Sequence, residues 1–122
     1  MTQTRTERPL IEWRDFLERL TAEHQGDEVT IEVMNPEIGD QDEAERLAFS
    51  YLEYDNKDDV VIVAVGGPDG RYPLLRHIIY HPRKILVDPP SPGSARAVEV
   101  EDHEATHTIV TFRPRAGRNP SS

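Results

Sequence analysis

Hydrophobic residues in the first part of the chain recur at helical spacing. Between Pro9 and Gly26 they follow one another at steps of three and four, and charged residues fill most of the positions between them. Steps of three and four place side chains on one face of a helix. The pattern predicts one amphipathic helix with an apolar face made by Leu10, Trp13, Leu17 and Leu20.

After Gly26 the hydrophobic period changes to two, which is typical of strands with one buried face. This alternation predicts strands at residues 29–34, 47–51, 75–81, 85–87, 98–100 and 109–112. Val60–Val65 is uninterrupted by polar residues, which favours a strand in the middle of the sheet, covered on both faces. The acidic stretch Glu37–Glu45 breaks the alternation, and we expect a loop or a short helical turn there.

Short turns join these strands, and the chain has no second periodic helix to supply parallel crossovers. We therefore expect an α+β fold, in which the N-terminal amphipathic helix packs on a largely antiparallel sheet of five to seven strands. The same pattern is also compatible with a sheet that closes into a small barrel. A chain of 122 residues fits one domain. We assign this domain to residues 9–113, between a flexible N-terminus at residues 1–8 and a disordered tail at residues 114–122.

Composition limits the class of protein. The absence of cysteine removes disulfides, thiolate metal sites and cysteine nucleophiles, and it suits a reduced compartment, so we expect a cytoplasmic protein. The longest apolar run, Val60–Val65, is far shorter than the ~20 residues that span a bilayer, so we expect no membrane association. The net charge of −9 opposes binding to nucleic acid.

The candidate metal motifs lack either the geometry or the residues that a metal site needs. His77 and His81 are four residues apart, but in a strand that spacing separates them by about 13 Å, too far to share a zinc ion. The acidic residues after Asp40 lack the glycine and the final glutamate of a calcium loop. We expect no metal and no cofactor. Because no catalytic set stands out either, the sequence favours a protein that is not an enzyme.

Four short motifs carry a resemblance to a known family. They are residues 13–17 (Trp-Arg-Asp-Phe-Leu), 24–26 (His-Gln-Gly), 29–33 (Val-Thr-Ile-Glu-Val) and 38–41 (Ile-Gly-Asp-Gln). Together they resemble a small bacterial family of unknown function, best over residues 11–55. The resemblance implies a bacterial protein with a single domain, and it brings no activity, substrate, cofactor or site residue with it.

The leading functional hypothesis is a non-enzymatic module for protein interaction or regulation. It relies on a sheet that leaves an edge or a face free. Its acidic segment would attract a basic partner through five carboxylates, those of Glu37, Asp40, Asp42, Glu43 and Glu45. An unprotected strand also predicts a homodimer, formed by edge pairing with a second copy.

Two alternatives stay open. One is a small-ligand binding protein or an enzyme, with a pocket lined by the polar-tipped rings of Tyr51, Tyr54, His77 and Tyr80. The other is an RNA-binding barrel similar to Sm modules, which a helix followed by a small antiparallel barrel would resemble. That likeness rests on fold analogy, which does not establish function.

Overall fold

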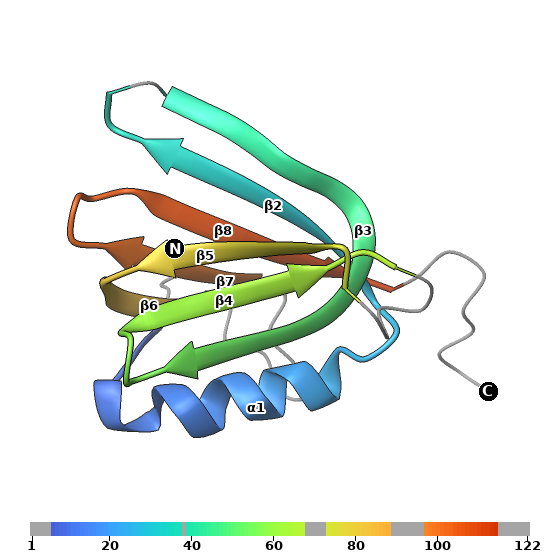
Figure 1. Ribbon diagram of the computed structural model, residues 1–122, viewed down its shortest axis with the longest axis horizontal. Helices are drawn as coiled ribbons and strands as arrows, with labels where there is room; N and C mark the ends of the chain where they lie inside the picture. Colours follow the sequence, from blue (N-terminus) through green and yellow to red (C-terminus); the bar gives the residue numbers. More distant parts are fainter. Residues whose placement is uncertain (1–5, 38, 68–72, 89–96, 115–122) are drawn as a thin grey trace, which may run out of the picture.

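The computed structural model describes residues 6–37, 39–67, 73–88 and 97–114, without the side chains of Thr6, Asp40–Glu45 and Asp88. It contains one α-helix, a short 3-10 helix and eight strands (Figure 1). In chain order these are β1 (Thr6–Arg8), η1 (Leu10–Glu12), α1 (Trp13–Glu23), β2 (Glu28–Asn35), β3 (Gly39–Asp55), β4 (Val60–Val65), β5 (Leu75–Tyr80), β6 (Pro82–Asp88), β7 (Ala97–Asp102) and β8 (His107–Arg113). The expected α+β class is confirmed.

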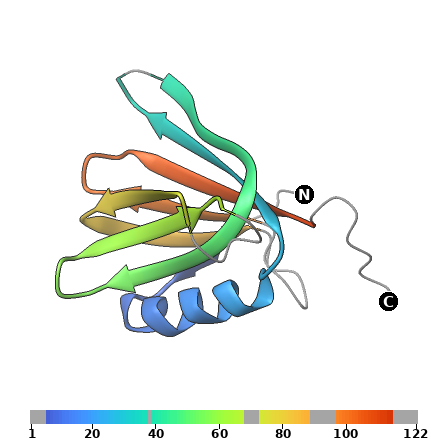
Figure 2. The same cartoon turned by 45° about the vertical axis from the view of Figure 1, so that its right-hand side comes forward.

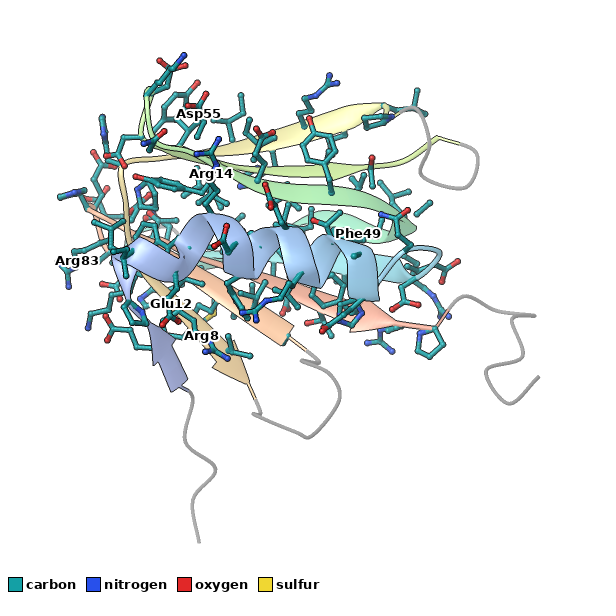
Figure 3. The ribbon with its side chains drawn as sticks, turned by 90° about the horizontal axis from the view of Figure 1, so that it is seen from below. Arg8, Glu12, Arg14, Phe49, Asp55 and Arg83 are labelled. Atoms are coloured by element: carbon teal, nitrogen blue, oxygen red, sulfur yellow. The ribbon has the colours of Figure 1, made fainter. Side chains whose placement is uncertain are left out.

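Helix α1 forms within the predicted range, but Leu10 belongs to η1 and is 61% exposed, so the prediction that Leu10 joins the apolar face is wrong. Its buried side chains, Trp13, Phe16, Leu17 and Leu20, make one stripe toward the sheet. Figure 3, which looks onto the helix from below, shows Glu12 at one end of it and Phe49 toward the other. At the C-terminal end the His24 ring stacks on Phe112, with ring centres 3.9 Å apart.

The eight strands form a single sheet in the order β1-β6-β7-β8-β2-β3-β4-β5, and every neighbouring pair is antiparallel. The expectation of five to seven strands is therefore corrected to eight. The additional strand is β1, whose three residues are too few to show a hydrophobic period. Residues 6–8, which the prediction placed in a flexible N-terminus, form β1. Residues 1–5 and the predicted tail beyond Pro114 lie outside the described residues.

The sheet does not close into a barrel, because β1 and β5 are its two edges. Strands β5 and β6 are consecutive and are separated by His81, whose φ of 54° bends the chain. β5 pairs with β4, whereas β6 pairs with β7. Since β7 ends at Asp102 and turns back into β8, no strand of this sheet continues along β5.

The acidic stretch at residues 37–45 is mostly strand, and the expectation of a loop or helical turn there is wrong. Gly39–Asp55 is one long strand, β3, whose first part pairs with β2 in a hairpin. It then curves and pairs with β4, as Figures 1 and 2 show. The hairpin turn uses Gly39 at a φ of 80°. Backbone pairing with β2 overrides the poor strand preference of the acidic residues.

Strand β4 is second from an edge of the sheet, which corrects the expectation that it lies in the middle. It is nonetheless buried on both faces, with Ala64 fully covered. Tyr51 of β3 and Arg76 of β5 are the register partners of Ala64 on either side. Arg76 Nε donates a hydrogen bond to Tyr51 Oη at 2.9 Å, and this pair of side chains flanks Ala64 on the outer face.

Helix α1 covers the free edge of the second half of β3. The Thr21 hydroxyl accepts a hydrogen bond from the Leu52 amide at 3.0 Å, and it lies 3.1 Å from the Leu52 carbonyl oxygen. Gln25 Nε2 donates to the Ser50 carbonyl at 3.3 Å. One side chain of the helix and one of the turn that follows it therefore take the place of a neighbouring strand and satisfy backbone groups that would otherwise need water.

Candidate functional site

A cavity of about 370 Å³ lies beside β5. One wall is the segment from His77 to His81, and the opposite wall is the turn between β7 and β8, with Val33 of β2 and Thr108 of β8 also lining the space. The complete lining is Val33, His77, Ile78, Ile79, Tyr80, His81, Asp102, His103, Glu104, Thr106 and Thr108. The cavity therefore lies between β5 and the turn that joins β7 to β8.

Hydrogen bonding to β4 fixes which way the backbone groups of β5 point. The His81 amide donates to the carbonyl of Asp59, the residue directly before β4, so His81, Ile79 and His77 direct their backbone groups toward β4. In an antiparallel ladder the alternate residues direct theirs away. The amides and carbonyls of Arg76, Ile78 and Tyr80 therefore face the open edge.

The side chains of β5 add an apolar surface to this edge. Four of the exposed large hydrophobic residues lie on β5 or directly before it, with exposures of 83% for Leu74, 38% for Leu75, 40% for Ile78 and 61% for Tyr80. Native edge strands are usually protected by charges, proline, bulges or a covering segment. An edge with this much exposed apolar surface is typical of an interaction site.

The turn between β7 and β8 is held in place by its own hydrogen bonds. Asp102 Oδ1 accepts bonds from the Glu104 amide at 2.8 Å and the Thr106 amide at 3.0 Å. Ala105 takes a φ of 64°. Asn35 Nδ2 donates to Thr106 Oγ1 at 2.9 Å, which ties the turn to the end of β2. The wall opposite β5 is thus a structured turn.

A chain of polar contacts lies next to the cavity at His81. Tyr54 Oη donates to Asp59 Oδ1 at 3.0 Å, and Asp59 Oδ2 lies 3.3 Å from His81 Nδ1. The His103 amide donates to the His81 carbonyl at 3.2 Å, and the two imidazole rings meet edge to face. Burial, followed by the hydrogen bond and negative charge of Asp59, raises the pKa of Tyr54 above its usual value.

The four residues predicted to line one pocket divide between the two faces of the sheet. Tyr54 and His77 share the inner face, where Tyr54 meets the Trp13 ring edge to face. Tyr51 and Tyr80 share the outer face. Only His77 and Tyr80 line the described cavity, so the structure does not assemble the four-residue pocket. A strand pattern separates odd from even residues, and that signal was present in the sequence.

The predicted acidic partner surface is only partly within the described residues. Glu37 is exposed before β3, and its amide donates to Asn35 Oδ1 at 2.8 Å. Asp40, Asp42, Glu43 and Glu45 belong to the first part of β3, and their side chains lie outside the described part of the chain. The carboxylates that the sequence reasoning did not select, Asp102 and Glu104, are the ones that line the cavity.

The described residues also bear on metal binding and on membrane insertion. Within the described ranges, no group of three or more histidine, aspartate or glutamate side chains is arranged to hold a metal ion. No helix in these ranges is long and apolar enough to cross a membrane.

Comparison with known proteins identifies the family. Residues 5–120 match a protein family described as a family of unknown function, DUF5335. The chain belongs to this family. The resemblance expected best at residues 11–55 thus extends over nearly the whole chain, including β5 and the turn between β7 and β8.

One relative is an uncharacterized protein of Aquifex aeolicus (strain VF5). It is 34% identical over 106 residues, which cover 87% of this chain and 89% of the relative. No solved structure matches. The relative's description names no substrate or partner.

Proposed function

We propose that this protein is a non-enzymatic interaction module that binds an extended segment of a partner protein along the free edge of β5. The observation that carries the proposal is the outward direction of the backbone groups of Arg76, Ile78 and Tyr80 at the end of the sheet. An extended peptide placed there would add a ninth strand to the sheet. Main-chain hydrogen bonds give such a complex its affinity, and side-chain pockets give it specificity.

The neighbouring surface suits this mode of binding. The exposed side chains of Ile78 and Tyr80 offer apolar contact on the outer face of the sheet, and the cavity of about 370 Å³ offers room on the inner face. Each backbone hydrogen bond contributes roughly 0.5–1.5 kcal/mol net. A short added strand together with buried apolar area therefore supports a reversible interaction.

The test replaces Ile78 with proline. The Ile78 amide faces the open edge, so proline removes a donor to the partner without removing a hydrogen bond to β4, and edge strands tolerate proline with that orientation. Ile78→Ala is the matched control, because it shortens the same side chain but keeps the amide. Peptides selected from a displayed library of random sequences are measured against the full chain and both variants.

We expect the selected peptides to bind Ile78→Pro about tenfold more weakly than Ile78→Ala, because proline removes the one backbone donor of this residue and leaves a carbonyl of the bound segment without a partner, which costs about 1–3 kcal/mol. Hydrogen exchange of the Ile78 and Tyr80 amides should slow on binding. Peptides that bind both variants equally well and leave these amides unchanged would show that the interaction surface lies elsewhere. A library that yields no binder would also contradict the proposal.

A further inference from the structure

We infer that the segment docked on β5 is basic and apolar: it places an apolar side chain beside Ile78 and a lysine or arginine at the turn between β7 and β8. This inference rests on the proposed function and specifies the chemistry of the partner. It follows from the charges that surround the two ends of the edge and from the side chains along it.

The apolar requirement comes from the outer face of β5. Side chains of neighbouring strands that are register partners lie about 4.5–5.5 Å apart at their Cβ atoms. A strand added beside β5 would therefore bring one side chain against Ile78 and another against Tyr80. Covering the exposed parts of these two residues favours an aliphatic or aromatic side chain in the partner, since apolar burial contributes about 25 cal/mol per Å².

The basic requirement comes from the wall opposite β5. Asp102 and Glu104 line the cavity, and its described lining contains neither lysine nor arginine. Asp102 uses Oδ1 to accept both turn amides, while its charge faces the same space. Asp59 does not line the cavity, but its carboxylate contacts His81, which does. An incoming lysine or arginine is complementary to this wall, and an incoming glutamate is repelled.

The net charge of the protein also favours a positively charged partner segment. Its net charge of −9 draws a basic segment toward the surface before contact, which raises the association rate more than it raises the final affinity. On the outer face, Glu53 and Asp55 are the same-face residues two strands away from Ile78 and Tyr80, while Arg76 of β5 carries the opposite charge, so the preference for a basic segment comes from the cavity side and from the net charge.

The experiment uses three synthetic peptides of equal length in which alternate positions are apolar. The intervening positions are lysine in the first peptide, glutamine in the second and glutamate in the third. Binding to the full chain is measured by fluorescence anisotropy at low and at high salt. A double variant, Asp102→Asn with Glu104→Gln, removes two charges from the cavity and keeps the Oδ1 acceptor that holds the turn.

The matched control is Glu18→Gln with Glu23→Gln on the exposed face of α1, which changes the net charge equally but lies on the helix. We expect the lysine peptide to bind about tenfold more tightly than the glutamate peptide, with the difference shrinking at high salt. The cavity variant should lose most of that preference and keep its affinity for the glutamine peptide. The helix variant should retain the preference.

Other results would overturn the inference in different ways. If all three peptides bind equally well and Ile78→Pro weakens all of them, the partner is not basic, although the proposed function stands. If none of the three peptides binds and Ile78→Pro does not weaken the binding of the library-selected peptides, the proposed function fails as well. If light scattering finds a dimer that Ile78→Pro converts to a monomer, the edge is occupied by a second copy of this chain and not by a basic partner.

Discussion

The second half of β3, β4 and β5 form a three-stranded part of the sheet whose two edges differ. The β3 edge is covered by α1 and the turn after it, where Thr21 of the helix contacts the Leu52 backbone and Gln25 of the turn contacts the Ser50 carbonyl. The β5 edge has no strand beside it and borders a cavity. Backbone donors and acceptors are therefore satisfied within the molecule at the β3 edge, whereas those at the β5 edge point away from the sheet.

Chain order explains the difference. Helix α1 leads directly into β2, which forms a hairpin with β3, so the helix is delivered next to the strand that it covers. After β5 the chain bends at His81 and enters β6, which pairs elsewhere. The comparison shows that a sheet edge in this fold is closed by whichever segment the connections bring there. The β5 edge stays without a neighbouring strand of this sheet because the chain after it pairs elsewhere.

The largest change in the free energy of unfolding should come from weakening the packing of α1, which covers the β3 edge. Leu20 of α1 is 1% exposed, and Leu20→Ala is expected to lower the free energy of unfolding by about 2–5 kcal/mol, through lost burial and a residual cavity. Ile78→Ala on the open edge should cost less than about 1 kcal/mol, because Ile78 is already 40% exposed. Urea denaturation of both variants measures the contrast, and equal losses would contradict it.

A smaller effect should follow from removing the hydroxyl that replaces a strand partner. Thr21→Val keeps the shape of the side chain but leaves the Leu52 amide without its acceptor, which is expected to cost about 1–3 kcal/mol. Thr111→Val on β8 serves as the control for the substitution itself. A Thr21→Val protein as stable as the Thr111→Val protein would show that α1 does not satisfy the β3 edge.

Hydrogen exchange should separate the two edges without any substitution. The amides of Ile78 and Tyr80 face the cavity and are expected to exchange at least about tenfold faster than those of His77 and Ile79, which face β4. The Leu52 amide, although it also lies at a strand edge, should be protected by Thr21. Uniform protection along β5 would mean that its outer edge is covered.

The smallest effect concerns pH. The pKa of Tyr54 is raised in the folded protein, so above about pH 10 the unfolded chain ionises this phenol before the folded one does. The stability that Tyr54 contributes is therefore fully present below that pH and is lost as pH rises. Tyr54→Phe should show a shallower loss of stability at alkaline pH, measured by denaturation across that range. An unchanged slope would rule out this account.

Much of the fold was readable from the sequence, because single elements have strong local periods. The helix is anchored by a stripe that includes Trp13 and Leu20, and the hairpin of β7 with β8 follows from alternation on both sides of a turn. The strand within residues 39–47 could not be read in the same way. Its acidic residues carry no apolar alternation, and only the pairing with β2 makes it a strand.

The candidate site was less accessible to sequence reasoning. Tyr51, Tyr54, His77 and Tyr80 were grouped because of their polar-tipped rings. The register places Tyr51 and Tyr80 on one face of the sheet and Tyr54 and His77 on the other. Asp102 and Glu104 gave no signal of their own, since carboxylates are common in this sequence. They become relevant through a turn that lies opposite a strand more than twenty residues away.

The sequence by itself determined which segments are helical or extended and which side chains are apolar enough to be buried. These properties depend on residues a few positions apart, so they are encoded locally. The tertiary structure decided which strand lies at the end of the sheet, which edge a helix covers and which carboxylates border the remaining gap. Those outcomes depend on register and on the path of the connections, where a bend at His81 changes the neighbours of an entire strand.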